Sequence, residues 1–300
     1  MKLPPRITVI TPSYNQGKFI ERTIQSVLAQ AVEGLEYLVI DGGSTDATVA
    51  ILQRQSDRFF WVSEPDQGHA DAINKGIARS TAPIIGWLNS DDIYYPGALT
   101  AVVEFFATHP EVDVVYGDAN HIDEYDAFID KYPTEPWTWE RLVETCFISQ
   151  PAAFMRRSIF DRYGLIDGRA APSIDYEFWI RLGKHGARFE FLPKLLAATR
   201  LHANAFTVCS RIACHQANNR FLRKHLGKVP DRWLFNYAHA VVESKRLQRS
   251  DAFTFALAVT LVSLYAALRW NHSISGAMGR TALGWMHGGV RRALLAKFTT

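Results

Sequence analysis

Residues 84–96 read IIGWLNSDDIYYP, and the interpretation of the whole chain depends on this stretch. It begins with an apolar run, residues 84–88, of the length and composition expected for a buried strand. The run stops at Asn89, Ser90, Asp91 and Asp92. Two adjacent carboxylates at the end of a buried strand repel each other and are costly to desolvate unless a cation binds them. Oxygen ligands of this kind suit Mg²⁺ or Mn²⁺ that bridges to a substrate phosphate.

A second interpretation of the same stretch requires no metal. In it, the stretch is a polar turn and Asp92 is the N-cap of the helix that follows Gly97, a role in which Asp is common. The stretch alone leaves both interpretations open, so the rest of the chain has to decide between them.

Strand-like and helix-like segments alternate over the first two-thirds of the chain. Apolar or β-branched runs occupy residues 7–11, 37–40, 59–62, 84–88 and 112–116. Between these runs, apolar residues recur at helical spacing. This alternation predicts an α/β fold with a mostly parallel sheet flanked by helices and joined by right-handed crossovers.

Polar residues follow the predicted strands. They are Thr11, Tyr14 and Asn15, then Asp41, then Glu64, Asp66 and Gln67, then Asn89, Asp91 and Asp92, and finally Asp118. In such sheets the ligand lies beyond the carboxyl ends of the strands. The chain contains neither the glycine fingerprint of dinucleotide-binding folds after its first strand nor a P-loop. These observations predict a phosphate site that works through a metal ion.

Five ordered motifs resemble family 2 glycosyltransferases. They are TPSYN at 11–15 with SVLAQ at 26–30, DGGSTD at 41–46, EPDQG at 64–68 with Ala72, Asn74 and Gly76, LNSDD at 88–92, and DYEFWIRL at 175–182. The resemblance covers about residues 5–205 of the chain. It implies a GT-A, Rossmann-like fold and an inverting transfer of sugar from a nucleotide-sugar donor.

The resemblance also implies six nucleotide-binding residues: Thr11, Pro12, Tyr14, Asp41, Asp66 and Asn89. The first three belong to the loop that packs on the nucleobase in the family, and Asp41 matches the aspartate that accepts a hydrogen bond from a uracil-type base. Asn89 stands where the family has the first aspartate of its D-x-D signature, which holds ribose. This departure replaces the carboxylate that would contact the ribose with a carboxamide.

The metal ligands implied by the resemblance are Asp91, Asp92 and His202. Asp91 matches the second aspartate of the D-x-D signature, and the adjacent Asp92 is a candidate to share the metal. His202 follows the predicted strand 189–196, near the place where the family often has a histidine that reaches the metal or the diphosphate. For a lone histidine, a structural role is the open alternative.

Asp175 matches the catalytic base of the family, although the glutamate that usually precedes this base is Ile174 here. One carboxylate that takes the proton of an acceptor hydroxyl suffices for such a reaction. The alternative is that Asp175 is the N-cap of the helix predicted over 176–184. Trp137, Trp139 and Trp179 are candidates for stacking on a sugar, with core packing as the alternative.

Charge and hydropathy set the C-terminal part of the chain apart. Residues 1–222 carry 21 Lys and Arg against 27 Asp and Glu (net −6), whereas residues 223–300 carry 12 against 3 (net +9). We therefore expect a catalytic domain over 1–222 and a basic, helical extension over 223–300. Residues 252–268 contain no charge, which suits a buried helix, a helix lying on an anionic membrane or a short membrane span.

Compartment and function follow as expectations. The three cysteines have no disulfide or metal-motif spacing, and residues 1–6 contain no long apolar run, so we expect a cytoplasmic protein with peripheral contact at the inner face of the membrane as an option. The favoured function is transfer of a sugar from a nucleoside-diphosphate donor, UDP-type, to a glycan or lipid-linked acceptor in polysaccharide or glycolipid assembly, with Mn²⁺ or Mg²⁺ as cofactor. A non-catalytic module that binds nucleotide-sugar or glycan is the alternative, and no nucleic-acid partner is expected.

Overall fold

The computed structural model describes residues 4–55, 57–203, 205, 210–245, 247 and 251–285. Cys209 and five basic residues of the predicted tail, Arg246, Arg249, Arg291, Arg292 and Lys297, lie outside this part of the chain. The chain forms two compact units, Met1–Leu142 with Cys146–Ala205, and Val143–Thr145 with Phe206–Thr300. The boundary expected at residue 222 falls inside helix α9 (Arg211–Leu226), which belongs to the second unit.

The first unit contains one sheet of nine strands. The strands are β1 (Ile7–Ser13), β2 (Leu35–Asp41), β3 (Phe60–Ser63), β4 (Ile84–Trp87), β5 (Ile93–Tyr94), β6 (Val114–Ile122), β7 (Phe128–Lys131), β8 (Ala153–Arg156) and β9 (Phe189–Arg200). Their order is β3-β2-β1-β4-β8-β6-β9-β5, with β7 paired to β6.

Parallel pairing is confined to parts of this sheet. The neighbours β3, β2, β1 and β4 are parallel, as are β6 and β9, whereas β8 is antiparallel to both β4 and β6. The predicted α/β fold with flanking helices is confirmed, with a sheet that is more mixed than expected. The prediction that Asp118 ends a strand is wrong, because β6 continues to Ile122 and Asp118 lies at a register shift against β9.

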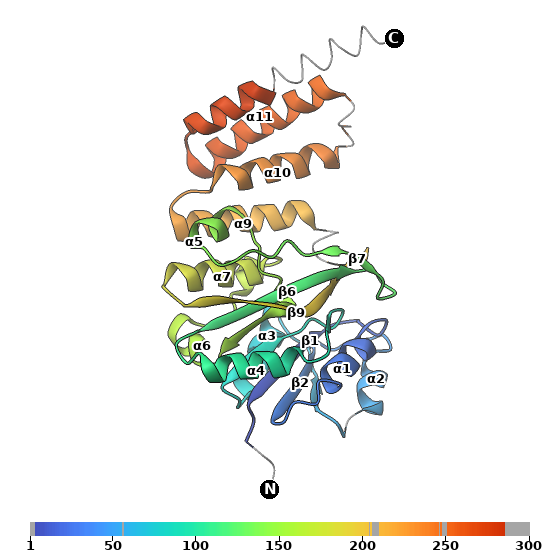
Figure 1. Cartoon of the computed structure of the whole chain (residues 1–300). Coiled ribbons are helices and arrows are strands. Elements are labelled where there is room, and N and C mark those ends of the chain that lie inside the picture. The colour runs from blue at the N-terminus through green and yellow to red at the C-terminus, as the bar shows by residue number, and fades with distance from the viewer. Residues whose placement is uncertain are drawn as a thin grey trace. The chain divides into compact units, whose positions relative to one another are not determined.

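Helices cover the sheet of the first unit (Figure 1). They are α1 (Ile20–Leu28), α2 (Thr48–Arg54), α3 (His69–Arg79), α4 (Ala98–Thr108), α6 (Ser158–Tyr163) and α7 (Ile174–Lys184), while α5 (Trp139–Glu144) spans the division between the units. Successive side chains of a strand point to opposite faces. Accordingly, Val9 packs in the cluster that includes α4, whereas Ile10 meets α3 at Gly76. A Cβ at Gly76 would lie 2.4 Å from Ile10 Cγ2, so a glycine allows this close approach.

The second unit is helical. It contains α9, α10 (Asp231–Ser244), α11 (Ala252–Asn271) and a helix over 276–285. In Figure 1, α10 lies between α9 and α11. Ala238 and Val242 of α10 pack against Phe255 and Val259 of α11. Among the described helices, α11 is long and apolar enough to cross a membrane by length and composition, and 33% of its most apolar window is buried.

Candidate active site

The polar end of β4 is the centre of the candidate site. The helix after it, α4, begins at Ala98 with Gly97 as its N-cap, so the alternative in which Asp92 caps this helix is wrong. The Asn89 carboxamide Oδ1 lies 3.0 Å from His69 Nε2, and its Nδ2 donates to Asp92 Oδ2 at 3.3 Å. The predicted ribose residue therefore lies between a histidine and a buried carboxylate.

Asp92 and Asp91 have different surroundings although they are adjacent. Asp92 is 2% exposed, and its Oδ1 accepts a hydrogen bond from the backbone N–H of Arg200 at 2.9 Å. Burial, and secondarily the neighbouring charge of Asp91, raise the pKa of the Asp92 carboxyl well above its ordinary value. Because its carboxylate already has partners inside the protein, the structure favours Asp91 over Asp92 as a metal ligand.

His202 lies beside Asp91. The imidazole Nε2 is 3.0 Å from Asp91 Oδ2, and the ring packs on Phe19 with centroids 4.6 Å apart. The described residues contain no group of three or more His, Cys, Asp or Glu side chains arranged to hold a metal by themselves. One carboxylate nevertheless fits Mg²⁺ or Mn²⁺, which complete their shell with water and substrate phosphates, and an imidazole beside it suits Mn²⁺ better than Mg²⁺. Asp91 and His202 would hold such an ion.

Arg200, two residues before His202, fixes the backbone of this region. Its side chain is buried, its Nε donates to the Asp91 carbonyl at 2.7 Å, and its Nη1 donates to the Asp123 carbonyl at 2.8 Å and pairs with Asp126. Its Nη2 is buried and has no hydrogen-bond partner among the described residues. One arginine thus ties the end of β9 to the turn after β4 and to the loop before β7.

His69 is a site residue that the sequence reasoning missed. It begins α3, and burial lowers the pKa of its imidazole, while the contact with Asn89 and the charges of Asp91 and Asp66 oppose that change. A neutral imidazole, with one donor and one acceptor nitrogen, can form a hydrogen bond of either direction with a ligand beside the predicted ribose residue. The signal available in the sequence was its position directly after the EPDQG motif at 64–68.

The three residues predicted to form the nucleotide loop are divided between β1 and the turn after it. Thr11 and Pro12 lie within β1 and are buried, and Thr11 Oγ1 lies 3.1 Å from the Tyr37 hydroxyl. Tyr14 is 61% exposed and is thus the member of this group with a free face for a base. Asn15 joins the loop to the next one, because its Oδ1 accepts from the Thr45 N–H at 2.9 Å.

The Asp41 side chain, at the end of β2, is fully buried. Its Oδ2 accepts from the Ser44 N–H at 2.9 Å and the Ser63 hydroxyl at 2.7 Å, and its Oδ1 accepts from the Ser44 hydroxyl at 2.5 Å. These bonds shape the loop after β2. Asp66 lies against this loop, since a Cβ at Gly42 would be 2.6 Å from Asp66 Oδ2. Gly42 therefore leaves the room that Asp66 occupies.

Asp175 lies in the first turn of α7. The N-cap of this helix is Ser173, so the alternative in which Asp175 is the N-cap is wrong. Burial raises the pKa of the Asp175 carboxyl above its ordinary value, although the side chain keeps partial exposure. A carboxylate in this environment binds a proton more readily than an ordinary aspartate, which suits a general base.

Stacked indoles connect α7 to β4. Trp179 and Trp87 are nearly parallel, with ring centroids 5.8 Å apart. Trp179 is fully buried, so it packs in the core and offers no face to a sugar. Because residues four apart share one face of a helix, the same pair orients the face of α7 that carries Asp175. Trp137 and Trp139 pack at Gly183, where a Cβ would come within 3.0 Å of either ring.

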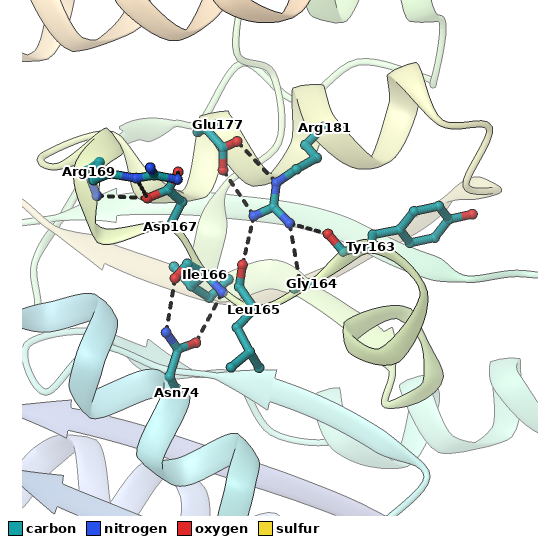
Figure 2. A network of polar contacts seen from close by, with 9 residues as sticks. All are labelled: Asn74, Tyr163, Gly164, Leu165, Ile166, Asp167, Arg169, Glu177 and Arg181. Carbon is teal, nitrogen blue, oxygen red and sulfur yellow. Dashed lines mark hydrogen bonds and ion pairs between the residues drawn. The ribbon is translucent and has the colours of Figure 1, made fainter.

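A polar network holds the segment that leads into α7 (Figure 2). Asn74 of α3 accepts from the Ile166 N–H at 3.0 Å and donates to the Ile166 carbonyl at 2.9 Å. Arg181 donates to the carbonyls of Tyr163 and Leu165, at 2.5 and 2.8 Å, and to both oxygens of Glu177, each at 3.1 Å. Asn74 and Arg181, which both occur in the motifs, thus hold residues 163–166 from two helices, α3 and α7.

Comparison with known proteins supports the family. The profile of glycosyl transferase family 2 matches residues 8–164. An uncharacterized glycosyltransferase of Nostoc sp. is 31% identical over 98% of this chain and 94% of its own length. The chondroitin synthase of Escherichia coli is 27% identical over 67% of this chain but only 30% of its own length.

Solved structures support the fold. TarS of S. aureus in complex with UDP-GlcNAc has a TM-score of 0.61 at 16% identity, over 86% of this chain and 82% of that chain. The mannosyltransferase PcManGT of Pyrobaculum calidifontis, in complex with GDP-Man and Mn²⁺, has a TM-score of 0.58 at 19% identity, over 98% of this chain and 86% of that chain. The predicted GT-A fold is confirmed, and the chain belongs to glycosyl transferase family 2.

Proposed function

We propose that this glycosyltransferase is an inverting enzyme that depends on a divalent cation and takes its sugar from a nucleoside-diphosphate donor, UDP-type. The observation that carries the proposal is the contact between Asp91 and His202, which brings a carboxylate and an imidazole from the ends of two strands to one point. Asp175 is the proposed general base, because its raised pKa suits its carboxylate to accept a proton.

The proposed reaction is a single displacement. The acceptor hydroxyl gives its proton to the Asp175 carboxylate as its oxygen attacks the anomeric carbon. The bond from that carbon to the diphosphate breaks, the nucleoside diphosphate leaves with the electron pair, and the configuration inverts. When bound, a divalent cation supplies charge that offsets the charge developing on the diphosphate. Asp91 and His202 orient the donor from its phosphate side.

Support for a nucleotide-sugar donor, though not for one base over another, comes from the neighbours. TarS binds UDP-GlcNAc and PcManGT binds GDP-Man with Mn²⁺, so nucleotide-sugar donors of either base suit this fold. The exposed ring of Tyr14 is the proposed platform for the base, and Asn89 with His69 the proposed contacts for the ribose. A glycan or lipid-linked acceptor, in polysaccharide or glycolipid assembly, fits the similarity to chondroitin synthase.

A donor screen tests the proposal. The purified chain is incubated with UDP-, GDP- and dTDP-sugars in Mn²⁺ or Mg²⁺, and release of free nucleotide is followed with and without a chelator. Release from a UDP-sugar that stops on chelation, and that is lost in Asp91→Asn and Asp175→Asn, is the expected result. The exposed Asp161→Asn serves as a matched control and should behave as the parent. Donor binding that never leads to release, even with lipid-linked acceptors present, would favour a non-catalytic binding module.

A further inference from the structure

Helix α11 is apolar on all sides but buried on only one. Such helices are usually enclosed by protein or in contact with lipid. The face of α11 toward the other helices buries Phe255 and Val259 together with five small or polar side chains, Ala256, Thr260, Ser263, Ala266 and Ala267. Its outer face carries large apolar side chains instead: Leu261, Tyr265 and Leu268 are 58%, 59% and 52% exposed. Large apolar side chains on the outer face are not expected for a helix that faces water.

The exposed side chains form one continuous stripe. Leu261, Tyr265 and Leu268 are spaced by four and three residues, so they lie on the same side of the helix, with the half-buried Leu257 and Leu264 beside them. Leu283, in the following helix, is 72% exposed. Contiguous apolar surface of this kind marks a contact with a partner or a membrane.

Charge indicates which partner fits. Residues 252–300 contain five Lys and Arg and no Asp or Glu. Two of these basic residues are described by the structure, Arg269 at the end of the stripe and Arg280, and both are exposed. Large apolar side chains on one face with basic residues at its end suit a helix that lies in the interface of a bilayer carrying anionic headgroups. The uncharged stretch 252–268 is only 17 residues long, and one face of α11 packs on α10, which favours lying on the membrane over crossing it.

We propose that α11 attaches this protein to an anionic membrane surface through the stripe formed by Leu257, Leu261, Leu264, Tyr265 and Leu268, with Arg269 and Arg280 contacting headgroups. The inner leaflet of a cytoplasmic membrane is such a surface. This attachment is independent of the donor and acceptor, because it involves no residue of the candidate active site.

Vesicle sedimentation of the full chain tests the proposal. Binding is measured to phosphatidylcholine vesicles and to vesicles of equal parts phosphatidylcholine and phosphatidylglycerol, without donor or acceptor. We expect binding to the mixed vesicles that weakens with added salt. The double variant Leu261→Gln with Leu268→Gln should bind about tenfold more weakly, because two half-exposed leucines no longer enter the bilayer. Ile129→Gln in β7 replaces an aliphatic side chain that is 46% exposed and should bind as the parent.

A charge variant provides the second test. Arg269→Glu with Arg280→Glu leaves the apolar stripe intact and should weaken binding to the mixed vesicles at least about fivefold. The proposal would be overturned if the parent and the leucine variant bound equally well. It would also be overturned if the parent bound neither kind of vesicle. A parent chain that forms dimers by light scattering, with the leucine variant monomeric and no vesicle binding, would assign the stripe to a second copy of the chain instead.

Discussion

The imidazole Nε2 of His202 lies 3.0 Å from Oδ2 of Asp91, although 111 positions separate the two residues in the chain. The contact requires the turn after β4 and the end of β9 to be held in a fixed relation. Arg200 and the buried Asp92 provide this, through the bonds from the arginine to the Asp91 carbonyl and from its backbone N–H to the Asp92 carboxylate. The candidate metal site is therefore supported by buried residues that need not touch the metal.

The first prediction concerns His202. His202→Ala removes one of the two proposed ligands, so the Mn²⁺ concentration for half-maximal nucleotide release should rise about 10- to 100-fold. It is measured by titrating metal at a fixed donor concentration. His185→Ala changes an exposed histidine elsewhere in the same unit and should leave the titration unchanged. If the Mn²⁺ titration of His202→Ala matched that of the parent, His202 would not be a ligand of the metal.

The second prediction compares two arginines that contact Asp126. Arg200 is buried, so Arg200→Met leaves buried carbonyls without their donor and should lower the free energy of unfolding by about 3 kcal/mol. Arg22 reaches the same carboxylate at 3.0 Å from the surface, and Arg22→Met should cost less than about 1 kcal/mol. Denaturant unfolding measures both. Equal losses of unfolding free energy in the two variants would show that the burial of Arg200 adds nothing to stability.

The third prediction concerns the network in Figure 2. Asn74→Ala removes both hydrogen bonds to Ile166 and should lower the free energy of unfolding by about 2 kcal/mol. Hydrogen exchange gives a local measurement, since the Ile166 amide should lose its protection. The Ala170 amide, which donates to the Asp167 carbonyl at 3.0 Å, is the control and should keep its protection. An unchanged Ile166 exchange rate would contradict the role given to Asn74.

The fourth prediction is a pH dependence. Burial raises the pKa of the Asp175 carboxyl, so this group is protonated, and unable to act as a base, up to a higher pH than an ordinary aspartate. The kcat/KM profile should therefore have an acid limb above the usual range of aspartate. An acid limb within the ordinary aspartate range would contradict the assignment.

The same raised pKa predicts how stability depends on pH. A group with a raised pKa in the folded state contributes stability below its unfolded pKa, and this contribution is lost as the pH rises through the folded pKa. At neutral pH the ionised Asp175 carboxylate therefore lowers the free energy of unfolding. Asp175→Asn should unfold at the same or a higher denaturant concentration than the parent at neutral pH. A clear loss of stability would indicate that Asp175 has a structural role.

Much of the fold could be predicted from the sequence, because strand and helix patterns in the first unit are local. The apolar run Ile84–Trp87 and the alternating strand-like and helix-like segments around it were sufficient to predict the sheet and the strand ends where a ligand would bind. The insertion of β8 antiparallel between β4 and β6 was not predictable, since long-range pairing leaves no periodicity in the strand itself. Asp118 was misplaced because nothing local marks the continuation of β6 to Ile122.

The candidate site could be predicted only in part. The motifs predicted Asp91, Asp92 and His202 as metal ligands. Adjacent carboxylates in a sequence do not reveal which one turns inward, and in the structure Asp92 does. His69 was missed because its contact with Asn89 is formed only by the fold. Trp179 was ambiguous for the same reason, since stacking on Trp87 or on a sugar would leave the same sequence.

The role of Asp175 as the catalytic base is tested most directly by comparing donor binding with sugar transfer in the Asp175→Asn variant. Donor binding in Mn²⁺ is measured by calorimetry, and transfer is measured by release of nucleotide at saturating donor. We expect the variant to bind donor as the parent does while turnover falls about 10²- to 10⁴-fold, because only proton transfer is lost. Turnover equal to that of the parent, in a variant that binds donor normally, would contradict Asp175 as the base.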